Sequence, residues 1–158
     1  MVQTMTRTLD TDQPEITVST SRFGTLTISA ENIITMVSPF LGFPGSRHFI
    51  LKPHTTESPF MWLQSLDEPD LAFVVTPAAT LTPQYQPAIS TLVRQELNAT
   101  ENDPLDILLI LTIPHGNPLK MTANLLGPVV INSQKRLAKQ VVQDPKFFDH
   151  CWPVFIEE

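Results

Sequence analysis

Short stretches in which apolar and polar residues alternate dominate the first third of the chain. Ile16–Thr20 and Thr25–Ser29 alternate with a period of two, which is the pattern of half-buried strands. Because the turn-forming pair Phe23-Gly24 separates them, the two stretches predict a β-hairpin. Glu31–Val37 and His48–Lys52 predict two further strands.

The middle of the chain contains two apolar segments joined by an acidic connection. Phe60–Leu66 and Leu71–Thr76 have the length and composition of strands. The connection Asp67–Asp70 is four residues long and contains a proline, which suits a tight turn between neighbouring strands. We expect the two segments to form part of the core, with Trp62 and Leu63 inside.

The second half of the chain predicts further strands and one short helix. The strands are expected at Asp106–Ile113, Lys120–Leu126, Pro128–Asn132 and Leu137–Gln143. Pro77–Pro87 contains three prolines, and we expect no regular element there. The helix is expected over Ala88–Asn98, where the residues at helical spacing are Ile89, Leu92, Val93 and Leu97.

The composition agrees with many short elements separated by turns. Fifteen of the 158 residues are proline, about twice the usual ~5%. We therefore expect a mostly β fold, a compact antiparallel β-barrel-like single domain with one short helix, since closure hides the strand edges. Residues 1–14 are expected to be a flexible N-terminal lead-in, and residues 15–143 the barrel. Residues 144–158 form an aromatic-rich C-terminal tail, which either docks on the barrel or waits for a partner.

The charge of the chain narrows the classes of partner. A net charge of −6 and the absence of a Lys/Arg run argue against direct binding to nucleic acid. An acidic chain instead attracts basic partners.

No apolar run approaches the ~18 residues of a membrane span, and the first twelve residues lack the apolar centre of a secretory signal. Together with the single cysteine, these features predict a cytoplasmic protein.

Residue types that carry chemistry are present, but their spacing predicts no catalytic, cofactor-binding or metal-binding residue. The four histidines show no common metal-ligand spacing with each other or with cysteine. Cys151 and His150 are adjacent, so on an extended chain their side chains point to opposite faces. No glycine-rich phosphate loop occurs.

Two features remain as candidate partner-binding residues. Asp67, Glu68 and Asp70 form the densest acidic cluster, and three interpretations stay open: a solvated turn, an acidic patch for a basic partner, or the cation site of a metal-dependent hydrolase. Phe43 lies in the apolar loop Pro39–Gly45, which is either an exposed aromatic site for a partner or a buried connection. The pattern favours the buried connection.

Six short motifs together resemble one known family. They are S-R-F-G-T-L at Ser21–Leu26, the loop Pro39–Gly45, F-M-W-L-Q-S-L-D-E-P-D-L-A-F at Phe60–Phe73, Tyr85 with the helix after it, M-T-A-N-L-L-G-P-V-V-I-N at Met121–Asn132, and K-Q-V-V at Lys139–Val142. In this order and without large gaps, they resemble the flagellar assembly factor FliW family over roughly residues 16–150. Two positions depart from the family pattern: Ser46 replaces a usual Phe, and Gly127 replaces a usual Ala.

The resemblance implies a cytoplasmic, non-catalytic β-barrel-like domain that works by binding. Members of the family bind flagellin before its export, and they bind CsrA, a small basic RNA-binding dimer that represses translation of flagellin mRNA. Binding to CsrA relieves the repression, and free flagellin competes for the FliW protein. We expect the chain alone to be a monomer, without cofactor. The alternatives are the metal-dependent hydrolase using Asp67, Glu68 and Asp70, and a divergent structural barrel with another protein partner.

Overall fold

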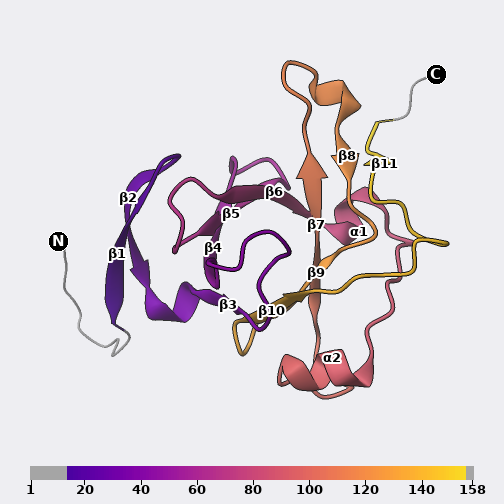
Figure 1. Ribbon diagram of the computed structural model, residues 1–158, viewed down its shortest axis with the longest axis horizontal. Coiled ribbons are helices and arrows are strands. Elements are labelled where there is room, and N and C mark those ends of the chain that lie inside the picture. The colour runs from indigo at the N-terminus through magenta and orange to yellow at the C-terminus, as the bar shows by residue number, and fades with distance from the viewer. Residues whose placement is uncertain (1–13, 156–158) are drawn as a thin grey trace.

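A sheet of seven strands closes on itself in the computed structural model, which describes residues 14–155 (Figure 1). The barrel strands follow the order β3, β4, β5, β6, β7, β9 and β10, and the pairing of β9 with β7 closes the ring. Their bounds are Ile34–Met36 (β3), His48–Pro53 (β4), Met61–Ser65 (β5), Ala72–Pro77 (β6), Asp106–Thr112 (β7), Val129–Asn132 (β9) and Leu137–Gln140 (β10).

Four more strands lie outside the ring. Glu15–Thr20 (β1) and Gly24–Ser29 (β2) form the predicted hairpin, which is therefore confirmed. Thr122–Ala123 (β8) pairs with β7, and Trp152–Pro153 (β11) pairs with β8. Among the described residues, all strand pairs are antiparallel except that of β3 with β10. The mostly β, barrel-like fold is thus confirmed, with one parallel pair that the sequence did not indicate.

Three predicted strands are shorter than expected: Leu137–Gln143 pairs only as far as Gln140, and in the other two, neighbouring residues form turns. Within Glu31–Val37, the 3₁₀ helix η1 takes up Ala30–Asn32 and the Ile33 N–H bonds the Ala30 carbonyl at 3.2 Å, so pairing begins only at Ile34. Within Lys120–Leu126, the 3₁₀ helix η2 (Pro118–Lys120) and a turn held by Asn124 leave two residues for β8. The Asn124 Oδ1 accepts the N–H groups of Leu126 and Gly127, each at 3.0 Å.

The described residues contain two short α-helices where the sequence predicted one. Helix α2 spans Thr91–Glu96 inside the expected Ala88–Asn98, because the Ser90 Oγ caps it by accepting the Val93 N–H at 3.1 Å. Helix α1, Ala78–Leu81, lies in the segment for which no element was expected. Pro77 directly precedes this turn and lacks the N–H that a helix leaves unpaired at its start, so it favours the turn rather than excluding it.

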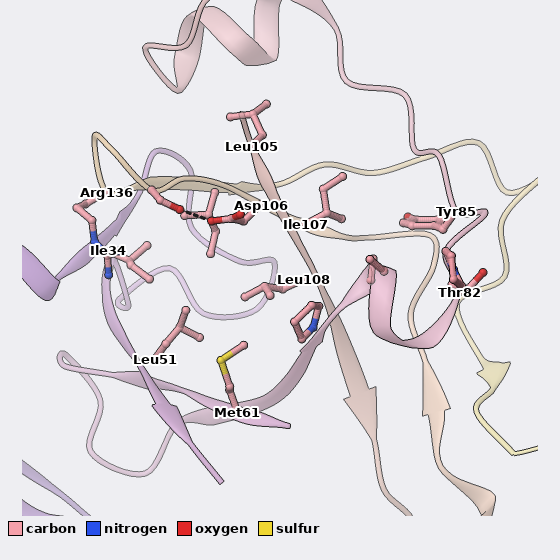
Figure 2. Close-up of a pocket in the computed structure, with 16 residues that line it drawn as sticks. Ile34, Leu51, Met61, Thr82, Tyr85, Leu105, Asp106, Ile107, Leu108 and Arg136 are labelled. Atoms are coloured by element: carbon pink, nitrogen blue, oxygen red, sulfur yellow. Dashed lines mark hydrogen bonds between the residues drawn. The ribbon is translucent and has the colours of Figure 1, made fainter. Parts of the chain in front are cut away.

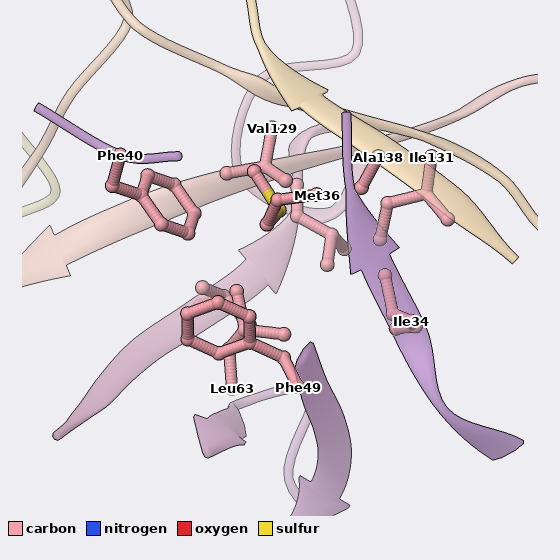
Figure 3. Close-up of a cluster of buried hydrophobic side chains, with 10 residues drawn as sticks. Ile34, Met36, Phe40, Phe49, Leu63, Val129, Ile131 and Ala138 are labelled. Atoms are coloured by element: carbon pink, nitrogen blue, oxygen red, sulfur yellow. The ribbon is translucent and has the colours of Figure 1, made fainter. Parts of the chain in front are cut away.

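The core fills the barrel with side chains from alternate positions of its strands. The ten residues of the central cluster include Phe40, which packs edge-on against Phe49 with ring centroids 5.5 Å apart (Figure 3). Leu63 is 1% exposed and belongs to this cluster, as predicted. The prediction for Trp62 is wrong: the side chain is on the opposite face of β5 and half-exposed, because neighbouring residues of a strand point to opposite faces.

The hairpin of β1 and β2 is attached to the barrel through this outward tryptophan. The Phe23 ring meets Trp62 edge-on at 6.3 Å, and the Arg22 guanidinium lies 4.0 Å from the Trp62 ring centroid. The Ser21 N–H donates to the Pro69 carbonyl at 3.0 Å. Aromatic packing and a cation–π contact therefore position the first two strands, which share no ladder with the barrel.

The described part of the C-terminal tail docks on the barrel. Phe148, Trp152 and the half-buried Tyr85 pack against a second apolar cluster, which contains the buried Leu109. The Tyr85 ring contacts Phe148 edge-on at 5.4 Å, and its hydroxyl donates to the Leu125 carbonyl at 2.6 Å. Two tail aromatics, Phe147 and Phe155, remain exposed. Residues 156–158 of the tail, and residues 1–13 of the expected lead-in, lie outside the described residues.

The direction of the strands gives the barrel two distinct ends. One end carries the Asp67–Asp70 turn and the loop between β3 and β4. The other end carries α1 and the turn between β9 and β10. No helix within residues 14–155 is long and apolar enough to cross a membrane.

Alkaline titration tests the docking of the tail, because Tyr85 is the only tyrosine. Burial raises the pKa of Tyr85 to about 12, compared with an ordinary value of about 10. We expect phenolate absorbance to titrate near pH 12 in the folded protein and near pH 10 in urea. Because the pKa is raised on folding, the stabilisation is complete below pH 10 and is lost as the pH rises towards 12.

A Tyr85→Phe variant is the control: it removes the absorbance change and this part of the pH dependence. A folded-state midpoint near 10 would contradict the docked position of the ring.

Candidate functional site

The three carboxylates of the Asp67–Asp70 turn accept hydrogen bonds from two other parts of the chain, Ser46–His48 and Ser21. The Asp67 Oδ2 accepts the backbone N–H groups of Arg47 at 2.7 Å and His48 at 2.9 Å. The Glu68 Oε2 accepts the Ser46 hydroxyl. The Asp70 Oδ1 accepts the Ser21 hydroxyl. The turn therefore ties together the start of β4, the loop before it and the N-terminal hairpin.

The pKa of Asp67 reflects these contacts. Burial by itself would raise the pKa of the carboxyl, but the Arg47 and His48 N–H groups and the His48 side chain together lower it below its ordinary value. The His48 Nδ1 lies 3.2 Å from the Asp67 Oδ2. Asp67 therefore stays ionised in the folded protein and keeps its negative charge at the surface.

Ser46, the first departure from the family pattern, lies beneath this turn. Its side chain is fully buried, and its hydroxyl bonds the Ser65 hydroxyl at 2.8 Å as well as Glu68. The Ser65 Oγ also accepts the N–H groups of Asp67 at 3.0 Å and Glu68 at 2.9 Å. A hydroxyl at position 46 thus completes a polar network that an aromatic side chain could not join.

Phe43 lies close to the turn and is half-buried. Its ring meets Phe73 edge-on at 5.7 Å, and its carbonyl accepts the Ser46 N–H at 3.2 Å. The most exposed apolar side chain of the loop is that of Leu41, at 96% exposure, beside Gly42 with a positive φ of 91°. The structure therefore brings the Phe43 loop and the acidic turn together at one end of the barrel, with Leu41 at the tip.

The same residues do not converge on a cation. The carboxylates of Asp67, Glu68 and Asp70 accept hydrogen bonds from two separate segments, Ser46–His48 and the turn at Ser21. Within residues 14–155, no group of three or more His, Cys, Asp and Glu side chains is arranged to hold a metal ion. The turn presents charge at the surface, with Asp67 and Asp70 exposed and Glu68 half-buried.

An apolar groove of about 690 Å³, which the sequence did not indicate, lies beside α2. One wall is the N-terminal part of α2 with the segment before it, and the other is β10 with the residues after it. Val142 is 76% exposed in this groove, and Leu92 on α2 is 65% exposed. The groove is lined by Ala88, Ile89, Ser90, Val93, Lys139, Gln140, Val141 and Val142.

The second departure from the family pattern affects the floor of this groove. The Gln140 Nε2 donates to the Gly127 carbonyl at 3.0 Å. A Cβ at position 127 would lie only 2.7 Å from that nitrogen, so alanine would displace the end of the Gln140 side chain. Gly127 therefore allows the Gln140 amide to pack there, and Gln140 in turn lines the groove.

Comparisons with known proteins agree with this architecture. The family model described as "FliW protein" matches residues 17–153. The flagellar assembly factor FliW of Magnetococcus marinus is 38% identical over 77% of this chain and 75% of its own length. The flagellar assembly factor FliW of Leptospira biflexa is 39% identical over 80% of this chain and 83% of its own length. A crystal structure of the flagellar assembly factor FliW superposes with a TM-score of 0.81 at 29% identity, covering 90% of this chain and 99% of that one.

The family match spans most of the chain, and the solved relative shares its barrel. The identities to curated relatives exceed 30% over more than two thirds of both sequences. The chain therefore belongs to the FliW family of flagellar assembly factors.

Proposed function

We propose that this protein acts in the cytoplasm by binding two protein partners, flagellin before its export and the translational regulator CsrA. Binding to CsrA relieves its repression of flagellin mRNA translation, and flagellin competes for the same protein. Membership of a family of flagellar assembly factors supports a protein-binding role. The observation that carries the proposal is that an acidic surface and an apolar groove occur near one end of one barrel.

For CsrA, we propose the surface of Asp67, Glu68, Asp70 and Phe43. CsrA is basic, and the chain has a net charge of −6, so long-range attraction favours their encounter. Two carboxylates of the turn are exposed, and Asp67 is held ionised by its hydrogen bonds. The adjoining Phe43 loop offers apolar area at Leu41. A charged rim beside an apolar centre is typical of protein interfaces.

For flagellin, we propose the groove between α2 and β10. An amphipathic helix binds by laying its apolar face into an apolar groove. The exposed Val142 and the walls formed by Ile89 and Val93 supply such a surface.

Competition between the two partners follows from the positions of these surfaces. Strands β10, β3, β4 and β5 are consecutive in the sheet, so β10 and β5 lie roughly 14 Å apart. Because β3 and β10 run parallel, the groove residues after β10 lie at the same end as the loop after β3 and the acidic turn. An interface of standard size covers about 800 Å² on each partner. Two bound partners would therefore overlap sterically.

Charge reversal of the turn tests the CsrA surface. Asp70 is the most suitable position, because Asp67 and Glu68 also support the loop before β4. We expect Asp70→Lys to weaken CsrA binding about tenfold at low salt and less at high salt. Isothermal titration calorimetry at two salt concentrations measures both effects.

Glu57→Lys is the matched control, since it makes the same charge change at the opposite end of β5, in an exposed position. Equal affinities for the two variants would remove the acidic turn from the CsrA interface.

A charge placed in the groove tests the flagellin surface. Val142 is 76% exposed, so Val142→Glu should leave the fold intact. We expect it to weaken flagellin binding at least about tenfold, because the interface would then bury an unpaired carboxylate. Fluorescence anisotropy with labelled flagellin measures the change.

Leu119→Glu is the control, because Leu119 is 68% exposed in the connection between β7 and β8, away from the groove. If Val142→Glu left flagellin binding unchanged, the flagellin helix would have to bind outside this groove.

A further inference from the structure

An apolar cavity of about 430 Å³ opens at the end of the barrel opposite the acidic turn (Figure 2). Its walls continue the barrel core: Leu51 and Met61 come from β4 and β5, and Leu108 comes from β7. Helix α1 contributes Ala79 at the rim. Cavities of roughly 300–1,000 Å³ with apolar walls and few polar groups are the usual form of small-molecule sites.

Arg136 is a cation at the rim of this cavity, and no carboxylate in the described part of the chain pairs with it. Within residues 14–155 it forms no ion pair, and the one hydrogen bond of its side chain runs from Nη2 to the Asn32 carbonyl at 2.9 Å. Its Nε is buried without a hydrogen-bond partner. The residue is half-buried and has a positive φ of 56°. A buried N–H donor without a partner is costly, and a guanidinium that is only partly hydrated favours an anion beside it.

The remaining polar groups at the rim limit the charge of a ligand. Asp106 lines the cavity, and its carboxylate accepts the Ser133 hydroxyl. Figure 2 shows Arg136 beside Ile34, with Asp106 further along the rim. Asp106 would repel a second or third negative charge on a ligand. The rim therefore suits a single anionic group placed at Arg136.

We propose that this cavity binds a small amphipathic monocarboxylate of the medium-chain fatty acid type. The apolar tail occupies the space between Leu51, Met61 and Leu108, where it is removed from water. The carboxylate accepts hydrogen bonds from the Arg136 guanidinium, whose planar N–H groups match a carboxylate in geometry and charge. This site is separate from the two proposed partner surfaces and does not depend on them.

Calorimetry with decanoate and decanol tests the site, because the two probes share a tail and differ in the head group. We expect saturable decanoate binding at one site on the full-length protein. We expect decanol to bind about tenfold more weakly, since it lacks the charge-assisted contact. In ¹³C-methyl NMR, the perturbed resonances should be those of Leu51, Met61 and Leu108.

Three variants check the assignment. Arg136→Gln should reduce decanoate affinity to the level of decanol, whereas Lys135→Gln removes a neighbouring, exposed charge and should leave it unchanged. Ala79→Trp fills the rim from an exposed position and should abolish binding of both probes. Thermal unfolding of each variant shows whether the fold is retained, and the comparison of the two probes on the natural protein requires no variant.

Several results would overturn the proposal. These are the absence of saturable decanoate binding, equal affinity for decanoate and decanol, and decanoate binding that Ala79→Trp or Arg136→Gln leaves intact. A short peptide with a free C-terminal leucine is a further probe. If it bound more tightly than decanoate, and its amidated form did not bind, the site would accept a chain end rather than a fatty acid.

Discussion

The pairing of β7 with both β6 and β9 closes the barrel, and every other element is built around that closed ring. One edge of β7 bonds β6 from Val74 to Pro77. The other edge bonds β9 in its first half and β8 in its second half. One seven-residue strand thereby closes the ring and holds the segment on which β11 docks. Closure removes the open strand edges that a flat sheet of this size would expose.

Closure also explains why the candidate surfaces occur where they do. The interior of the barrel is occupied by its core, so binding residues are left to the loops at the two ends and to the outer wall. One end combines the acidic turn with the Phe43 loop, and the groove beside β10 lies towards that end. The other end is less completely filled and keeps an apolar cavity with Arg136 at its rim.

Most of the fold could be predicted from the local pattern of apolar and polar residues. Period-two alternation located β1 and β2, and apolar runs bounded by prolines located β7. The errors arise where a nonlocal contact or a turn outweighs the pattern. Trp62 belongs to a strongly apolar run, yet strand geometry turns it outward, where Phe23 and Arg22 cover it. Helix α1 occupies a proline-rich segment, because one helical turn needs only the bond from the Thr82 N–H to the Ala78 carbonyl.

The candidate site was only partly accessible from sequence. The acidic turn was visible as a cluster, but its hydrogen bonds reach residues that are distant along the chain, including Ser21 and Ser46. The sequence therefore could not show that Asp67 and Glu68 support the fold as well as the surface charge. The groove was not visible either, because its two walls come from α2 and β10, which three other strands separate along the chain.

We propose that one barrel binds flagellin and CsrA in mutually exclusive complexes. The most direct test is light scattering after size exclusion of the protein with each partner and with both together. We expect a complex with either partner alone, and release of CsrA when flagellin is added in excess. A stable complex containing all three proteins, or no complex with either partner, would contradict it.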